Sequence, residues 1–398
     1  MSKQESTLQQ VHLRTDELSP GPWVFGRQID EVGQPPEPGA LVEVLDATGR
    51  FVGHGLFNLA SDIRVRMLSR GRRKDLDRPR EFLLGRLKAA DRLRRRTLRL
   101  EEVTNAYRVA HAEGDDLPGL IVDRLGSHLV CEYHSLGFWR LRESIEWALR
   151  QLYPKLEVVH RVPGPAARAE DFDPAVLEEQ EAREAPEIEI AEHGLRYPVR
   201  PAFGHKTGWF CDQRENRKLV GALCAGREVL DLCCNAGGFS LHAKRAGARR
   251  VIGVDLDEVV LARASAAARL NDLEVEFRHF DGFHYLRGAR EAGALSDVIV
   301  LDPHKLVPGK RELEGGLRKY SDFNTLALEC VRPGGLLATF SCSGAVSEPA
   351  FIGMLFQSAR RAGRTVKLLA QLGAGPDHPQ RPEFNRSRYL KGAILAVD

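Results

Sequence analysis

Short apolar runs alternate with amphipathic stretches in the second half of the chain. The runs EVLDLC, RVIGVDL, VEFRHF, DVIVLD and GLLATFS resemble buried strands, and the stretches GGFSLHAKRAG and 258–270 have helical spacing. Strands that alternate with helices predict a mostly parallel sheet that is covered on both faces. We therefore expect an α/β domain with a Rossmann-like sheet at residues 196–398.

The first half has a different pattern, which predicts two smaller domains. Short β-type runs at 41–46, 51–58 and 63–69 are separated by Gly, Asp and Ser turns, so we expect a small β-barrel-like domain over residues 1–75. A basic helix, a pair of strands and an amphipathic helix follow. They indicate a central α+β domain over residues 76–195.

Composition excludes several classes of protein. Of 398 residues, 43% are hydrophobic and 28% are charged, which is typical of a globular protein and excludes disordered and fibrous classes. No apolar run reaches ~18 residues, and the first ten residues are polar, so we expect no membrane segment, no secretory signal and a cytoplasmic location. The seven cysteines are scattered without a paired CxxC spacing, which favours reduced thiols and no metal site.

Charge is distributed unevenly, although the formal net charge is only +3. Residues 70–99 contain thirteen basic and four acidic side chains, which indicates either a surface for RNA phosphates or a solvated helix face. The candidate RNA contacts in this stretch are Arg72, Arg73 and Lys74. Residues 168–192 carry ten acids against two arginines, which favours a surface insertion or linker.

A row of carboxylates indicates a nucleoside-type cofactor. The strand VLDLCC ends in a small-residue loop that contains Asn235 and Gly237, with Asp231 at the strand end. Asp255 and Asp281 end the next two strands, where carboxylates can bind ribose hydroxyls and an adenine edge. The loop lacks GxGxxG, so S-adenosyl-L-methionine fits better than a dinucleotide. The alternative is a set of helix-capping aspartates in another α/β protein.

The fourth and fifth strands end in candidate reaction residues. Asp302 follows DVIVLD and Cys342 follows GLLATFS, and neighbouring strands would bring both to one cleft. A thiolate that adds to C6 of a pyrimidine makes C5 nucleophilic, after which a base must remove the C5 proton. Asp302 could orient the base, stabilise a sulfonium or accept that proton. Lys305 could bind phosphate, lower the thiol pKa or be a solvated surface lysine.

Longer segments resemble a known family. TNAYRVAHAEGDDLPGLIVDRLG, GHKTGWFCDQRENR, VLDLCCNAGGFSLHA, LDPHK, RKYSDFNTLALECVRPGGLLATFSCS and RSRYLKGAILAV are similar to the ribosomal RNA large subunit methyltransferase I family, which makes 5-methylcytosine in 23S ribosomal RNA. The resemblance covers essentially the whole chain. It implies an amino-terminal PUA domain, a central α+β domain and a carboxy-terminal class I methyltransferase domain.

The resemblance also assigns residues. It implies that Cys342 is the catalytic thiol and that Asp302 belongs to the catalytic loop. It implies a second group near the cofactor or the RNA, with Gln213 expected at the cofactor and Lys206 and Arg214 at the RNA. The implied cofactor contacts are Asp231, Asn235, Gly237, Asp255, Asp281 and Asp302.

Three functions remain open at this stage. The leading hypothesis is C5-methylation of a cytidine in large-subunit ribosomal RNA, for which Cys342, Asp302 and Lys305 are the catalytic candidates. Pro303 follows the acidic strand end as in the loops with which amino-methyltransferases hold an exocyclic amine, so N-methylation of a purine by this loop is an alternative. The family's DPPKF is DPHKL here, so His304 leaves the target base open. A non-catalytic RNA-binding assembly factor is the third. We expect ribosomal RNA as the partner and no membrane, and a homodimer is left open.

Overall fold

The computed structural model of the chain describes residues 8–16, 20–30, 33–71, 76–181, 186–309 and 311–398. The chain divides into two compact units, and each is described by itself. Unit 1 consists of Met1–Ile188, Arg200–Trp209 and Pro376–Ser387. Unit 2 consists of Glu189–Val199, Phe210–Gly375 and Arg388–Asp398.

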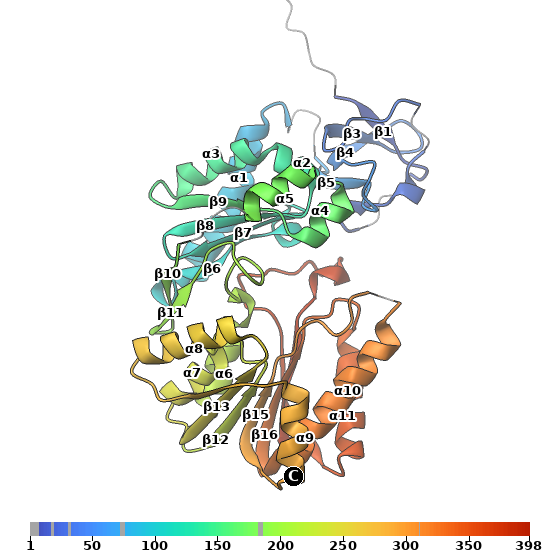
Figure 1. The fold of residues 1–398 in the computed structure, drawn as a ribbon. Helices are drawn as coiled ribbons and strands as arrows, with labels where there is room; N and C mark the ends of the chain where they lie inside the picture. Colours follow the sequence, from blue (N-terminus) through green and yellow to red (C-terminus); the bar gives the residue numbers. More distant parts are fainter. Residues whose placement is uncertain (1–7, 17–19, 31–32, 72–75, 182–185, 310) are drawn as a thin grey trace, which may run out of the picture. The chain divides into compact units, whose positions relative to one another are not determined.

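The first sheet of unit 1 is formed by the short β-type runs near the amino terminus (Figure 1). Its order is β1-β3-β4-β5-β2, and its core contains Val11, Val42, Val44 and Phe57. The strands are β1 (Gln10–His12), β2 (Trp23–Val24), β3 (Leu41–Leu45), β4 (Phe51–Phe57) and β5 (Val65–Ser69).

The second sheet of unit 1 has the order β6-β7-β8-β9. Leu83 and Leu87 of helix α1 pack in the same apolar cluster as Val122 and Leu129 of the sheet, which anchors the basic helix on its apolar side. The strands are β6 (Ala106–His111), β7 (Leu120–Leu125), β8 (His128–Tyr133) and β9 (Glu157–Arg161), and the helices are α1 (Pro79–Arg92), α2 (Leu136–Arg140), α3 (Arg142–Leu152), α4 (Gly164–Glu170) and α5 (Pro174–Glu181).

A late segment of the chain completes unit 1. Arg94 lies in a π-helical turn after α1, and its side chain has no exposed surface. Its Nη2 donates to the carbonyl of Asp377 at 2.6 Å, and the Asp377 carboxylate accepts from the Arg108 backbone N–H at 3.0 Å. Asp115 accepts from both terminal nitrogens of Arg94. The segment Pro376–Ser387 therefore supplies partners for two arginines that come about 270 residues earlier in the sequence.

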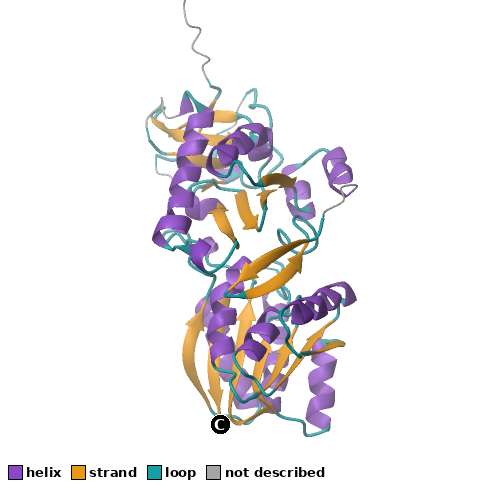
Figure 2. Cartoon of the chain, turned by 90° about the vertical axis from the view of Figure 1, so that its left-hand side faces the viewer, coloured by secondary structure: helices purple, strands orange, loops and turns teal. Residues whose placement is uncertain are grey.

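Unit 2 is built on one large sheet, whose strands are drawn in orange in Figure 2. The sheet has seven strands in the order β14-β13-β12-β15-β16-β18-β17. The first five of these strands pair in parallel, whereas β18 is antiparallel to both of its neighbours. The strands are β12 (Glu228–Leu232), β13 (Arg250–Asp255), β14 (Glu276–His279), β15 (Ser296–Leu301), β16 (Val331–Ser341), β17 (Val366–Leu372) and β18 (Lys391–Val397), and β10 (Ile188–Glu192) and β11 (Leu195–Val199) form a separate pair.

Helices cover both faces of this sheet, as the apolar pattern predicts. Leu230 and Leu232 of β12 pack in one apolar cluster with α10 and α11, whereas Val229 packs in another with α6 and α7. Successive side chains of β12 point to opposite faces of the sheet and therefore pack in two different cores. The helices are α6 (Arg214–Ala222), α7 (Gly238–Arg245), α8 (Glu258–Leu270), α9 (Gly282–Glu291), α10 (Leu313–Cys330) and α11 (Glu348–Arg361). No helix in the described part of the chain has the length and hydropathy to cross a membrane.

The acidic segment 168–192 differs from a plain surface linker at both ends. Glu170 is buried and accepts from Arg66 at 2.8 Å, and Glu192 is buried between α6 and α7. There Arg217 donates from Nε and Nη2 to the two Glu192 oxygens at 2.7 and 2.5 Å, and His242 lies 3.3 Å from one of them. A count of charges does not show that these two glutamates are buried, because each is paired with an arginine that is distant in sequence.

We predict that Glu192→Gln lowers the stability of unit 2 by about 3–5 kcal/mol, because it leaves the buried Arg217 charge without its counterion. Burial raises the pKa of Glu192, but Arg217 and His242 outweigh it and hold the pKa below its usual range. The contribution of the Glu192 carboxylate to stability is therefore present above pH ~4.3, the pKa of the unfolded state, and is lost as pH falls toward the lower folded pKa. Urea denaturation, monitored by hydrogen exchange of the β12 and β13 amides, measures the free energy of unfolding of unit 2.

Glu189→Gln is the matched control, because Glu189 lies on the same strand, is half exposed and stands 3.8 Å from a half-exposed Arg196. An exposed pair of this kind contributes at most about 1 kcal/mol. Equal effects of the two substitutions would contradict the prediction.

Candidate functional site

The loop after β12 has a backbone conformation that few side chains favour. Cys233, Asn235 and Gly237 have φ angles of 59°, 49° and 75°, so three of five consecutive residues are left-handed. At Gly237 a Cβ would also lie 2.9 Å from the Phe277 ring and 3.0 Å from Leu241, so only glycine fits here. The loop leads into the amino terminus of α7, which begins at Gly238.

Asp255, at the end of β13, holds this loop in place. One carboxylate oxygen accepts from the Asn235 backbone N–H at 2.8 Å, and the other accepts from the Asp257 N–H at 3.0 Å. The sequence predicts Asp231, Asn235, Gly237 and Asp255 as one group, and β12 and β13 are indeed parallel neighbours. Asp255 is partly exposed, so its oxygens can also accept from a ligand.

Asp231 lies fully buried beneath the loop. Its Oδ2 accepts from the Ser240 backbone N–H at 2.9 Å and from the Ser240 hydroxyl at 2.6 Å. Its Oδ1 has no hydrogen-bond partner among the described residues. Burial raises the pKa of Asp231 to about 7, with Ser240 opposing the shift and the charges of Asp302 and Asp255 adding to it. A ligand that brought a positive charge or a hydrogen-bond donor to Oδ1 would favour the ionised form of Asp231.

Asp281 and Asp302 have different surroundings. Asp281 caps α9, because its Oδ1 accepts from the backbone N–H of His284 at 2.8 Å, so the helix-cap alternative describes this residue correctly. Asp302, after β15, accepts from Gln213 Nε2 at 2.9 Å, and Asn216 Nδ2 in turn donates to Gln213 Oε1 at 2.6 Å. Gln213 and Asp302 are thus brought together, and Asn216, which the sequence did not indicate, is hydrogen-bonded to Gln213.

Cys342 follows β16, the direct parallel neighbour of β15. The structure therefore brings Asp302 and Cys342 to the ends of adjacent strands. Lys305 is exposed, as is His304. Lys391, which opens β18, is a buried lysine close to Cys342 that the sequence analysis did not single out. The one feature of the sequence that could have indicated Lys391 is its place in the segment RSRYLKGAILAV, which resembles the family.

The cysteines fall into distinct classes. Only Cys233 and Cys342 are partly exposed, and the other five are buried. Burial raises the pKa of Cys233 well above its ordinary value, and nearby aspartates add to the shift. Burial likewise raises the pKa of the thiols of Cys131, Cys224, Cys234 and Cys330. Because the thiolate is the nucleophile, we expect inert thiols at Cys233 and at the four buried cysteines just named.

The structure describes the predicted RNA contacts only in part. Arg72, Arg73 and Lys74 lie outside the described residues. Lys206 belongs to unit 1 and is partly buried with a φ of 51°. Arg214 belongs to unit 2, has no exposed side-chain surface, and its Nε donates to Glu215 at 2.9 Å. A role for these residues at the RNA stays a prediction.

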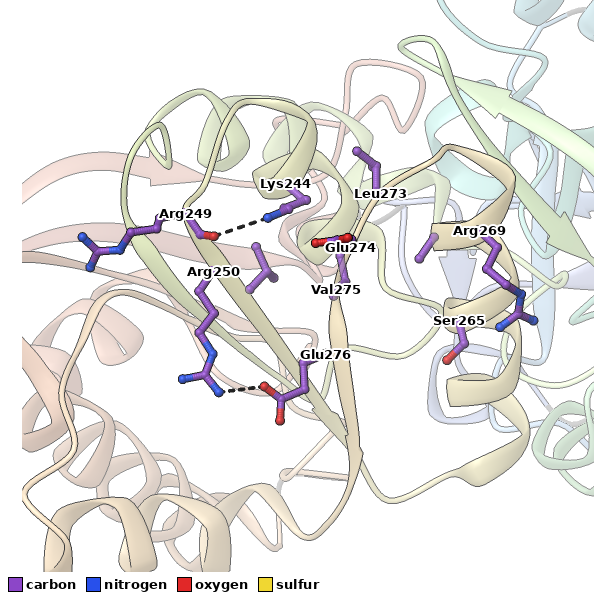
Figure 3. Close-up of a pocket in the computed structure, with 11 residues that line it drawn as sticks. Lys244, Arg249, Arg250, Ser265, Arg269, Leu273, Glu274, Val275 and Glu276 are labelled. Carbon is purple, nitrogen blue, oxygen red and sulfur yellow. Dashed lines mark hydrogen bonds and ion pairs between the residues drawn. The ribbon is translucent and has the colours of Figure 1, made fainter.

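A cavity of about 560 Å³ lies at the other ends of the strands (Figure 3). Arg250, at the start of β13, and Glu276, at the start of β14, line it and form an ion pair at 2.8 Å. In a parallel sheet, ligands bind beyond the carboxyl ends of the strands. The candidate site therefore lies at the carboxyl ends of the strands, where Asp231, Asp255, Asp302 and Cys342 are found. The described residues contain no cluster of His, Cys, Asp or Glu that could hold a metal ion.

The chain is similar to known proteins along most of its length. A family model described as a PUA-like domain matches residues 20–70, and one described as an S-adenosylmethionine-dependent methyltransferase matches residues 162–391. Proteins named Ribosomal RNA large subunit methyltransferase I from Aeromonas salmonicida and Tolumonas auensis are each 35% identical to this chain. The first match covers 94% of both chains, and the second covers 97% of this chain and 98% of the relative.

Solved structures show the same fold at lower identity. A structure from Streptococcus mutans described as a SAM-dependent methyltransferase has a TM-score of 0.79 at 20% identity, covering 98% of this chain and 100% of that chain. A methyltransferase structure complexed with SAH has a TM-score of 0.81 at 20% identity with the same coverage. The comparisons confirm the predicted fold class and S-adenosylmethionine as the cofactor.

We predict that Asp255→Ala weakens S-adenosylmethionine binding by about 10- to 100-fold, because the loop loses its backbone anchor and the ligand loses an acceptor. Isothermal titration calorimetry measures the dissociation constant. Asp257→Ala is the matched control: Asp257 is exposed, and its side chain caps α8 through Val259 and Val260. An Asp255→Ala protein that binds as tightly as the control would remove Asp255 from the site.

The pKa of Asp231 predicts an unusual pH dependence. Above pH ~3.9 the unfolded carboxyl is ionised, but the folded one keeps its proton until pH approaches its pKa of about 7. The contribution of Asp231 to stability therefore falls as pH rises from about 4 to 7, on the order of a few kcal/mol in total. Asp231→Asn should remove this fall when urea unfolding is compared without cofactor at pH 5 and pH 8. Identical pH dependence of the two proteins would show that folded Asp231 is already ionised at pH 5.

Proposed function

Because the chain belongs to the ribosomal RNA large subunit methyltransferase I family, we propose that it methylates C5 of a cytidine in large-subunit ribosomal RNA. One observation carries the choice of chemistry. Cys342 is a partly exposed thiol that directly follows β16, and Asp302 directly follows β15, the parallel neighbour of β16. The proposal uses this thiol as the nucleophile.

The covalent step explains why a thiol is needed. The Cys342 thiolate adds to C6 of cytosine, which forms a carbon–sulfur bond and leaves C5 electron-rich. S-adenosylmethionine supplies the electrophilic methyl group and departs as S-adenosylhomocysteine. A base then removes the C5 proton, and the electron pair of that C–H bond expels the thiolate from C6, so that Cys342 is regenerated. Asp302, at the end of the adjacent strand, is the carboxylate available to take that proton or to orient the ring.

Residues of unit 2 hold the cofactor in this proposal. The loop of Asn235 and Gly237 lies against it, and Asp255 accepts from its ribose. Asp231 offers the Oδ1 that has no donor among the described residues. Gln213 fixes Asp302 through the 2.9 Å hydrogen bond. Asp281 serves at the adenine edge while it caps α9.

The RNA must present an unstacked cytosine, because C5 and C6 are shielded within a helical stack. The PUA-like domain and the basic stretch at 70–99 would bind the RNA backbone, and the pocket would select the base. Lys305 is exposed at the loop after Asp302, where it would meet phosphate. The proposed location is the cytoplasm, and a homodimer stays a prediction.

We predict that Cys342→Ala lowers methyl transfer by a factor of at least about 1,000, because the thiol forms the covalent adduct and no neighbour replaces it. S-adenosylmethionine binding should change less than about threefold, since the proposed mechanism uses Cys342 on the target base and not on the cofactor. The assay transfers labelled methyl groups to ribosomal RNA from cells that lack this protein. Nucleoside mass analysis then identifies the product.

Cys330→Ala is the matched control, because Cys330 is a buried thiol at the end of α10 whose pKa burial raises to about 11. It should keep wild-type transfer. Formation of 5-methylcytidine by Cys342→Ala at the control rate would contradict the thiol mechanism. A methylated purine from both proteins would instead move the chemistry to the DPHK loop, and S-adenosylmethionine binding without any product would indicate an assembly factor.

A further inference from the structure

A buried lysine lies beside the proposed nucleophile. Lys391 opens β18 and pairs with Ser341 across the antiparallel ladder, and Ser341 is the residue before Cys342. Only 4% of the Lys391 surface is exposed. Its Nζ donates to the carbonyl of Ser343 at 2.6 Å and to that of Tyr389 at 2.9 Å. The ammonium is thus hydrogen-bonded to Ser343, the residue that follows Cys342.

The surroundings leave the charge of Lys391 without a bonded counterion. Among the described residues, its hydrogen-bond partners are the two carbonyls, and no carboxylate lies within ion-pair distance. Burial lowers the pKa of Lys391 to about 8, Cys342 and Glu348 act in the opposite direction, and Lys305 adds to the lowering. Lys391 therefore keeps its proton at pH 7. A buried ammonium with only neutral partners is costly unless a negative charge forms near it.

We propose that the buried Lys391 ammonium stabilises the thiolate of Cys342 and keeps this thiol reactive at neutral pH. The inference rests on the proposed function, in which Cys342 is the nucleophile. The thiol releases its proton to solvent, and Lys391 keeps its own proton throughout. Lys391 is accordingly a positioning residue that acts through Cys342 and need not touch the RNA or the cofactor.

Burial makes Lys391 a better partner than Lys305 for this purpose. Lys305 is exposed, so water screens its charge. Lys391 is shielded from water and held by two hydrogen bonds, so its charge acts at full strength on a neighbouring anion. A purely structural tie between β18 and the loop after β16 needs hydrogen-bond donors but no charge. Replacing the ammonium by a neutral donor separates the two roles.

The experiment measures the thiolate directly. The full-length protein is alkylated with iodoacetamide from pH 6 to pH 10, and mass spectrometry quantifies the peptide that contains Cys342, with Cys342→Ala as the blank. Lys391→Gln keeps donors and removes the charge, whereas Lys391→Arg keeps the charge. We expect alkylation of Cys342 in Lys391→Gln to be about tenfold slower at pH 7, equivalent to one pKa unit, with substantial recovery in Lys391→Arg.

Lys367→Gln is the matched control, since Lys367 is exposed on β17 and pairs with Asp398 at 3.4 Å. It should alkylate like the wild type. Unchanged alkylation in a Lys391→Gln protein that still binds S-adenosylmethionine overturns the inference. So does equal slowing in Lys391→Gln and Lys391→Arg, because that result indicates a structural tie.

The alkylation profile also separates this inference from the proposed function. A shifted profile together with a purine product in the methyl-transfer assay supports the Lys391–Cys342 coupling and rejects cytidine C5 chemistry. An unshifted profile together with 5-methylcytidine rejects the coupling and retains the chemistry. The two readouts are independent, because alkylation needs neither RNA nor cofactor.

Discussion

The Asp255 carboxylate sets the geometry on which the rest of the site depends. It accepts from the backbone N–H of Asn235 with one oxygen and from that of Asp257 with the other. The loop of Asn235 would otherwise be unfavourable, since it contains three left-handed residues, two of which are not glycine. Tying this loop to the end of β13 fixes the start of α7, and Ser240 of that helix then holds Asp231. Loop, helix and carboxylates are thus one connected arrangement.

Parallel pairing explains why the sequence predicts much of this arrangement. Each apolar strand from β12 to β16 is followed by polar or small residues, and parallel neighbours bring those residues to one edge. Asp231, Asp255, Asp302 and Cys342 can all be identified by this rule. The alternating strands and helices likewise predict the sheet, because Val229 and Leu230 belong to different cores.

Residues that depend on long-range contacts could not be predicted in the same way. Lys391 lies beside the segment that contains Cys342 because β18 inserts antiparallel between β16 and β17, and no local pattern indicates that insertion. Asn216 matters through Gln213, which contacts Asp302 from a distant part of the chain. The family resemblance implies Arg214 as a candidate RNA contact, although folding buries its guanidinium. Burial of a charged side chain is a tertiary property that composition does not show.

The interleaving of the two units limits how this protein can be divided. Unit 1 contains Pro376–Ser387 as well as the amino-terminal half, and Asp377 of that segment accepts from Arg94 and Arg108. No single cut in the chain therefore separates a complete unit 1 from a complete unit 2. A gene fusion or split that exchanged one unit would have to carry three separate pieces of sequence together. During synthesis, unit 1 also lacks its last piece until residue 387 has left the ribosome, so its folding is completed only after Phe210–Gly375 of unit 2 has been made.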